Sequence, residues 1–125
     1  MIIVVRKDSL VRDVQYQFTV PFPFLKIEFL RGSFEGEAIL KKEYADPGEF
    51  FKRIPSLKSE GEIDLDFKQT VSELEDHFKE YYGVSIHIFR KAGNVWIETT
   101  LTNDWTLERQ NKEAEQLCRH FSKRS

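Results

Sequence analysis

Cysteine is almost missing from this chain, because Cys118 is the only one and no internal disulfide can form. A single thiol is typical of proteins that work in a reducing compartment. Long hydrophobic runs are missing too, and no segment approaches the roughly 20 apolar residues of a membrane span. The first apolar run, Ile2–Val5, is too short for a signal peptide and has no basic flank. We therefore expect a cytoplasmic protein without membrane contact.

The chain also lacks a strong charge of either sign, since 19 basic and 21 acidic residues give a formal net charge of -2. Proteins that bind the phosphate backbone usually present a strongly basic face, so nucleic acid is disfavoured as a partner. Two segments nevertheless combine cations with aromatic rings, Phe89–Lys91 and Arg119–Arg124. An accessory nucleic-acid-binding domain therefore stays an alternative hypothesis.

Motifs for catalysis or metal binding are missing as well. The three histidines, His77, His87 and His120, fall on different predicted elements, and no pair has the spacing of metal ligands. There is no glycine-rich phosphate loop, nucleophile elbow or Cys-x-x-Cys pair, and the carboxylates are scattered. We expect no metal and no cofactor, and the balance favours a non-enzyme. A small-molecule enzyme or sensor remains a further alternative.

What the sequence does contain is the composition of an ordinary folded protein. Of its 125 residues, 40% are apolar and 32% are charged, which indicates a single domain over 1–125. A chain of this length buries roughly two thirds of its unfolded surface, so it needs no staple. The 11 phenylalanines are best explained by a phenylalanine-rich core.

Hydrophobic periodicity orders the chain into strands and helices. Apolar residues alternate with polar ones in the strands and recur at i, i+3 and i+7 in the helices. The predicted strands cover 2–7, 24–31, 37–44, 62–67, 84–90 and 95–100, and the predicted helices cover 10–20, 70–82 and 104–121. These elements predict an α+β fold: one mainly antiparallel, twisted sheet of five or six strands, with two long helices and a C-terminal helix packed on one face.

Side chains at the helix ends give more detailed expectations. Asp8 or Ser9 is expected to cap the first helix, and Asn103 or Asp104 the last. Thr70 and Glu73 form a T-x-x-E capping box at the start of the second helix. Gly83 follows that helix where a left-handed C-cap is expected.

The two halves of the chain, 1–55 and 62–125, match in pattern. A shift of 60 aligns Ile3 with Ile63, Val5 with Leu65, Val11 with Val71, Val14 with Leu74 and Phe18 with Phe78, and a shift of 59 aligns Ile27 with Ile86, Phe29 with Ile88 and Arg31 with Arg90. Each half then reads strand, helix, strand, strand. A chance likeness of two such units is the alternative. A true duplication would relate the helices at 10–20 and 70–82 by a pseudo-two-fold axis.

The final hairpin and the helix after it hold the most distinctive group of polar and aromatic residues. The candidate binding residues are Arg90, Lys91, Asn94, Trp96, Glu98, Thr100, Asp104 and Trp105. Alternation places Trp96, Glu98 and Thr100 on one side of the return strand, where a tryptophan among polar groups suits a recognition surface. The competing interpretation is structural: the two tryptophans cover the sheet, and Thr102 and Asp104 satisfy helix amides.

The same region carries a resemblance to a known family. Residues 89–111 read FRKAGNVWIETTLTNDWTLERQN, and the segments Arg12–Gln15 and Pro23–Phe29 also take part. They resemble a small bacterial family of Bacteroidetes type, whose members carry FRK-x-G, then Trp-x-x-Thr-Thr, then Thr-Asp-Asp-Trp-Thr-Leu. The matching positions are Phe89, Arg90, Lys91, Gly93, Trp96, Thr99, Thr100, Asp104, Trp105, Thr106, Leu107, Gln110 and Asn111, while Asn103 departs from the acidic residue of that pattern. The resemblance implies a bacterial, cytosolic domain and carries over no catalytic residue.

Together these observations favour a protein-binding or assembly module over the two alternatives. The expected partner is another protein or a second copy of the chain.

Overall fold

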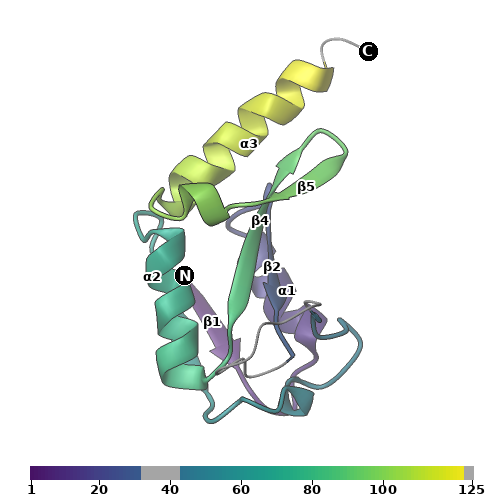
Figure 1. Cartoon of the computed structure of the whole chain (residues 1–125), viewed down its shortest axis with the longest axis vertical. Coiled ribbons are helices and arrows are strands. Elements are labelled where there is room, and N and C mark those ends of the chain that lie inside the picture. Colours follow the sequence, from purple (N-terminus) through teal and green to yellow (C-terminus); the bar gives the residue numbers. More distant parts are fainter. Residues whose placement is uncertain (32–42, 123–125) are drawn as a thin grey trace.

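The structure is a computed structural model that describes residues 1–31 and 43–122. Within these ranges five strands and three α-helices form an α+β fold (Figure 1). The strands are β1 (Ile2–Val5), β2 (Leu25–Phe29), β3 (Gly61–Asp64), β4 (Ile86–Ala92) and β5 (Val95–Glu98), and the α-helices are α1 (Val11–Thr19), α2 (Val71–His77) and α3 (Leu107–Ser122). Short helical turns are η1 (Phe51–Arg53), η2 (Phe78–Tyr82) and η3 (Thr100–Thr102).

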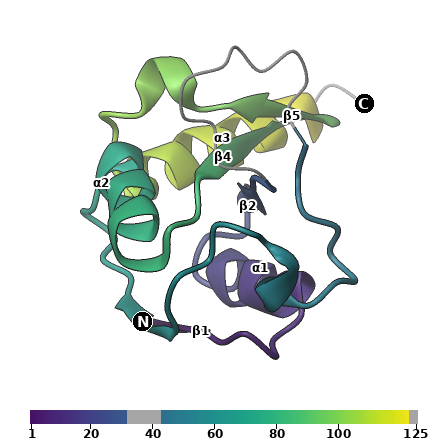
Figure 2. The ribbon, with the colours of Figure 1, turned by 60° about the horizontal axis from the view of Figure 1, so that its bottom comes forward.

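The strands form two small antiparallel sheets, so the expectation of one sheet with five or six strands is wrong. β1 pairs with β3, and β2, β4 and β5 form a separate sheet with β4 in the centre. Figure 2 shows β1 on the opposite side of the molecule from the β4–β5 hairpin. Most of the strand expected over 37–44 lies outside the described residues, but Tyr44 forms an isolated bridge with Leu30.

Side chains close the outer edges of the β1–β3 pair, which explains why the sheet does not continue. The amide of Gln17 on α1 accepts a hydrogen bond from the Val4 N–H at 2.8 Å and donates one to the Val4 carbonyl at 3.2 Å. On the other edge the Tyr82 hydroxyl donates to the Glu62 carbonyl at 3.0 Å. These backbone groups are the ones a further strand would need, so the pair stays isolated.

One hydrophobic cluster nevertheless joins both sheets and all three α-helices. It contains Ile3 and Ile63 from the small sheet together with Leu25, Ile27 and Ile88 from the larger one. Its largest side chains are fully buried phenylalanines, namely Phe18, Phe22, Phe29, Phe51 and Phe78. Five of the 11 phenylalanines therefore serve this core, where each ring contributes a large apolar area, whereas Phe50 and Phe67 are 45% and 46% exposed.

The helices before α3 are short, contrary to the expectation of two long ones. α1 has 9 residues and α2 has 7, whereas α3 has 16. The helical path of α2 continues through Tyr82 as a π-helical turn, and Gly83 ends it in the left-handed conformation at φ 72°. A Cβ at Gly83 would lie 2.3 Å from the Ser56 carbonyl oxygen, so glycine is required both for its φ and for space.

Helix caps agree with the sequence only at α2. There the Thr70 hydroxyl accepts a hydrogen bond from the Glu73 N–H at 3.1 Å. The Glu73 carboxylate accepts a hydrogen bond from the Thr70 hydroxyl, and not from the Thr70 N–H as in a full capping box. Neither Asp8 nor Ser9 caps α1, whose N-cap residue is Leu10 without a side-chain cap. At α3 the Thr106 hydroxyl accepts from the Arg109 N–H at 3.1 Å, in place of the expected Asn103 or Asp104.

Backbone carbonyls of distant segments cap α1 and α2 in the same manner. At α1 the N–H groups of Val11 and Arg12 donate to the carbonyls of Glu49 (2.9 Å) and Pro47 (2.9 Å). In return, the N–H groups of Phe51 and Lys52 donate to the carbonyls of Ser9 (2.8 Å) and Lys7 (3.0 Å). At α2 the N–H groups of Val71 and Ser72 donate to the carbonyls of Trp105 (3.2 Å) and Asn103 (2.8 Å). In return, the N–H groups of Leu107 and Glu108 donate to the carbonyls of Gln69 (2.8 Å) and Phe67 (3.0 Å). The second set repeats the first with shifts of 60 and 56 residues.

The strand registers follow the same relation. Ile3 pairs with Ile63, its equivalent under a shift of 60, and Glu28 pairs with His87, its equivalent under a shift of 59. An antiparallel pair of related strands is centred on equivalent residues when a two-fold axis passes between them. Both pairings between the halves meet that condition.

Candidate functional site

The β4–β5 hairpin and α3 extend together to one end of the molecule, the end where the C-terminus lies (Figure 1). The hairpin turns at Gly93, which takes a positive φ of 64°. In the hairpin register Arg90 is paired across the strands with Ile97, and Lys91 is paired with Trp96. Since side chains alternate along a strand, Arg90 and Ile97 share the face that α3 covers, and Lys91 and Trp96 share the opposite face.

The hairpin therefore separates the eight candidate residues instead of gathering them. Lys91, Trp96 and Glu98 lie on the face away from α3, and Asn94 is exposed in the turn. Thr100 belongs to η3 and not to the strand, so it does not continue the row of Trp96 and Glu98. Asp104 is exposed in the segment that leads to α3, and Trp105 is half-buried beside it.

On the α3 side, two arginines hold one indole ring between β4 and α3. The guanidinium carbon of Arg109 lies 3.8 Å from the centre of the Trp105 ring, and that of Arg90 lies 5.4 Å from it. The negative face of an indole attracts such cations, but it does not neutralise their charge. Within the described part of the chain, neither arginine forms an ion pair with a carboxylate.

Gln110 connects this cluster to the backbone below it. Its side chain is fully buried and donates to the Thr102 carbonyl at 2.7 Å and to the Thr102 hydroxyl at 2.8 Å. Its carbonyl oxygen accepts from Arg90 Nη1 at 3.2 Å. A buried amide with these partners holds η3 against α3 and fixes the position of the Arg90 head group.

The opposite face of the hairpin carries a second polar group. Lys26 Nζ lies 5.1 Å from the ring centre of Phe89 and also 5.1 Å from that of Trp96. Nearby, His87 Nδ1 lies 3.0 Å from a Glu98 carboxylate oxygen and 2.8 Å from the Tyr44 hydroxyl. Burial, and secondly the charge of Glu98, raise the pKa of Tyr44 to about 12.

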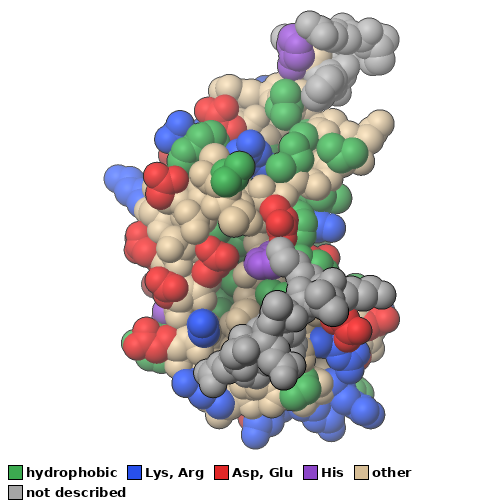
Figure 3. Space-filling view, viewed as in Figure 1, with side chains coloured by type: hydrophobic (Ala, Val, Ile, Leu, Met, Phe, Trp, Pro, Cys, Tyr) green, Lys and Arg blue, Asp and Glu red, His purple; other side chains and the backbone are tan. Residues whose placement is uncertain are grey.

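Apolar side chains are exposed along the outer strand and next to it. Val95 is 58% exposed, Trp96 39% and Ile97 41%, while Leu101 on η3 is 98% exposed and Leu117 on α3 is 37% exposed. Figure 3 shows hydrophobic side chains gathered over this upper part of the molecule. We call Val95, Trp96, Ile97 and Leu101 the apolar edge. Exposed apolar groups in one place are a common mark of an interaction surface.

β5 is also an edge strand of its sheet in the described residues. It pairs with β4 on one side, whereas the opposite edge strand, β2, is joined by bonds from Arg31 to Glu43 and from Ala45 to Phe29. Proteins usually protect such an edge with lysine, proline or a bulge. The only charged residue of β5 is Glu98, and its carboxylate is turned toward His87.

Trp105 has a structural role in addition to its contact with the arginines. Its carbonyl and that of Asn103 accept hydrogen bonds from the first amides of α2. The segment expected to cap α3 therefore caps α2 instead.

Burial, and secondly the neighbouring Asp76, raise the pKa of Glu75 on α2, while a hydrogen bond with the Asn103 side chain opposes that shift.

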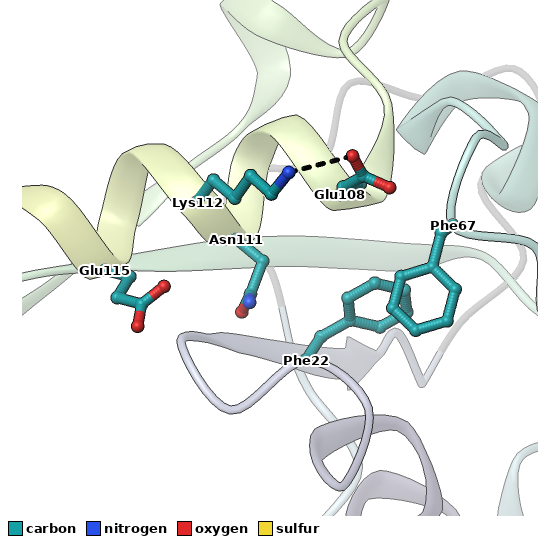
Figure 4. Close-up of a pocket in the computed structure, with 6 residues that line it drawn as sticks. All are labelled: Phe22, Phe67, Glu108, Asn111, Lys112 and Glu115. Carbon is teal, nitrogen blue, oxygen red and sulfur yellow. Dashed lines mark hydrogen bonds and ion pairs between the residues drawn. The ribbon is translucent and has the colours of Figure 1, made fainter.

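A small pocket lies on another face of α3. It has a volume of about 240 Å³ and is lined by Phe22, Phe67, Glu108, Asn111, Lys112 and Glu115 (Figure 4). The centres of the two phenylalanine rings lie 5.1 Å apart with the rings tilted, and Lys112 is paired with Glu108 at 3.1 Å. Small-molecule sites usually measure about 300 to 1,000 Å³, so this pocket is small for such a role.

Two further findings concern metals and membranes. Among the described residues, no group of three histidine, cysteine, aspartate or glutamate side chains is placed to hold a metal ion. No helix in that part of the chain is long and apolar enough to cross a membrane.

Sequence reasoning singled out Arg90 and Trp105 but missed Arg109, Gln110 and Ile97. Arg109 and Gln110 lie inside a helix that was expected to be apolar on one side and solvated on the other, and residue type alone assigns a glutamine to the solvated side. Ile97 was not a candidate, because alternation shows which side chains share a face but does not reveal which strand is outermost. The available signal was the position of Gln110 at the regular spacing i, i+3 and i+7 of Leu107, Gln110 and Ala114.

Comparison with protein-family models, curated proteins and solved structures finds no match.

Proposed function

We propose that this chain is a protein-binding or assembly module of a bacterial cytoplasm, without catalytic activity, and that it binds its partner along β5. The observation that carries this proposal is the exposure of three consecutive side chains, Val95, Trp96 and Ile97, on an edge strand. The lone thiol of Cys118 favours the reducing compartment.

The edge supplies two kinds of interaction at once. The outward N–H and C=O groups of an edge strand can pair with an added strand, which provides affinity that does not depend on sequence. Its exposed side chains then select among strands, since alternate residues of the partner contact opposite faces. β5 has only four residues, and a short edge limits open-ended association.

A tagged chain tests this proposal in two assays, capture of partners from a bacterial extract and sedimentation of the isolated chain. We expect Ile97→Lys and Trp96→Ala to abolish the captured proteins or the self-association, while circular dichroism shows a folded chain. Tyr16→Ala is the matched control, because Tyr16 is an aromatic side chain on α1 that is 70% exposed. Unchanged capture by both edge variants would reject β5 as the contact surface.

We also propose that residues 1–55 and 62–125 arose by duplication of one strand–helix–strand–strand unit. The matching bonds at the starts of α1 and α2 support this, as do the pairs Ile3–Ile63 and Glu28–His87. In each half the second strand also contacts the segment that follows it, through the bridge Leu30–Tyr44 in the first half and the pairing of β4 with β5 in the second. Homologous chains should then show greater identity between halves at these positions than at others, and equal identity throughout would argue against duplication.

A further inference from the structure

Arg90 and Arg109 are two cations without a carboxylate partner among the described residues. Arg90 is the register partner of Ile97 in the apolar edge, and Arg109 contacts the same indole ring as Arg90. We propose that the strand received by β5 belongs to a different protein and carries an acidic side chain on the α3 side of the sheet. This inference rests on the proposed function and adds the chemistry of the partner.

The strand register places the cations where an added strand can reach them. Arg90 is the direct partner of Ile97, and both side chains lie on the α3 side. Neighbouring strands run about 4.8 Å apart, so an added strand would lie about 10 Å from β4. Every second residue of that strand would stand beside Val95 and Ile97 on the α3 side. A glutamate there can extend across Ile97 toward Arg90.

The Arg90 head group has hydrogen-bonding capacity to spare. A guanidinium offers five N–H donors, and the Gln110 carbonyl uses one of them at 3.2 Å. Arg90 is half-buried, so its charge is less well hydrated than that of an exposed arginine. A carboxylate can satisfy two donors at once, which makes it a better ligand here than a neutral group.

Two carboxylates of α3 pair with cations of their own helix, and Glu113 is exposed one turn after Arg109. Glu108 is paired with Lys112 at 3.1 Å, and Glu115 is paired with Arg119 at 2.7 Å. Glu98 lies on the other face of the hairpin, 3.0 Å from His87. Arg90 therefore has no carboxylate partner among the described residues, and its contacts are the Gln110 carbonyl and the Trp105 ring.

The same geometry argues against a second copy of this chain as the occupant. If two β5 strands paired around a two-fold axis, the α3 side of each would meet Val95 and Ile97 of the other. Glu98 of the copy would lie on the opposite side, and the second copy would add its own arginines on the α3 side. The edge strand of a second copy would therefore bring no carboxylate to the side of the sheet on which Arg90 lies.

A displayed library of random decapeptides tests the inference on the full-length chain. The library is selected on the wild type and on Ile97→Lys, and the strongest binder is compared with its counterpart in which glutamate is replaced by glutamine. Both peptides are titrated by fluorescence anisotropy against the wild type, Arg90→Gln and Arg109→Gln. Arg119→Gln is the control, since it removes a cation of the same helix that is already paired.

We expect the wild type to select apolar sequences that alternate with acidic residues, and Ile97→Lys to select none of them. The glutamate-to-glutamine change should weaken binding to the wild type and to Arg119→Gln by at least about tenfold. It should have less than about a twofold effect on the other two arginine variants. Because Arg109 is exposed, its variant keeps the test informative if Arg90→Gln fails to fold.

Selected peptides that depend on Ile97 but not on charge would overturn this inference and leave the proposed function standing. Failure of the wild type to select any peptide that Ile97→Lys does not also select would reject both. A concentration-dependent dimer that Ile97→Lys abolishes would assign the edge to a second copy and overturn the inference of a foreign acidic strand.

Discussion

Replacement of Gln110 by leucine should destabilise this protein more than the same replacement at Gln116, the other glutamine of α3. Gln110 is fully buried and touches three polar atoms, the Thr102 carbonyl, the Thr102 hydroxyl and Arg90 Nη1. Leucine has a similar size but can bond none of them. The change therefore removes one partner from each bond and leaves the other partner behind.

The expected magnitude follows from these three bonds. A hydrogen bond contributes about 0.5 to 1.5 kcal/mol to stability, and a buried group left unpaired costs more than the bond alone. Three lost bonds give a loss of about 2 to 4 kcal/mol. The greater hydrophobicity of leucine offsets about 1 kcal/mol of this. We therefore expect the free energy of unfolding to fall by about 2 kcal/mol.

Urea denaturation followed by tryptophan fluorescence measures this difference, because Trp105 lies in the same cluster. The control is Gln116→Leu, which makes the same chemical change at an exposed position of α3. It should alter stability by less than about 0.5 kcal/mol. Equal stabilities for the two variants would show that the Gln110 network contributes no net stability and would refute the reasoning.

Three other predictions address the fold. Gly83→Ala should cost at least about 2 kcal/mol through its left-handed φ and the 2.3 Å approach to the Ser56 carbonyl. Gly83→Asn should not restore stability in thermal melts, because its Cβ meets the same oxygen, and Gly48→Ala should be nearly neutral. Gln17→Leu should cost about 1 to 3 kcal/mol in urea, because it leaves both polar groups of Val4 unpaired, and no loss would mean that water replaces the amide. Because the pKa of Tyr44 is raised, the folded state keeps the Tyr44 proton between about pH 10 and 12 while the unfolded state loses it. The contribution of this hydroxyl to the free energy of unfolding is therefore fully present below pH 10 and is lost as the pH rises to 12. Tyr44→Phe should lose less stability over that interval than the wild type, and its absorbance titration should lack one late-ionising tyrosine; identical curves would contradict the shift.

Local patterns predicted most elements correctly where a short stretch of chain determines them. The alternation around Ile63 and Leu65, the helical stripe from Val71 to Phe78 and the glycine turn at Gly93 all appear in the structure. Each depends on interactions within a few residues, so the sequence contains the whole signal.

The predictions that failed depend on segments far apart in the chain. Asp8 and Ser9 seemed suitable caps for the first helix, but the carbonyls of Pro47 and Glu49 satisfy its amides. Asn103 seemed a cap for the last helix, but its backbone caps α2. A local capping pattern does not exclude a better acceptor that arrives from elsewhere in the chain.

The candidate site divides in the same way. Arg90, Trp96 and Trp105 stand out in the sequence by residue type, because large aromatic and cationic side chains are frequent in recognition surfaces. Whether they act together depends on the hairpin register and on the position of α3, which place Arg90 and Trp105 on one face and Trp96 on the other.

By itself, then, the sequence determined the order of strands and helices, the phenylalanine-rich interior and the internal likeness of the two halves, since all of these are properties of residue spacing. Only the tertiary structure decided that the strands form two sheets, because the side chains of Gln17 and Tyr82 occupy the backbone groups that would have joined them. It also decided that β5 is an exposed edge strand whose Ile97 pairs with Arg90, a cation without an ion pair among the described residues. Which strand is outermost depends on long-range pairing, and periodicity carries no information about it.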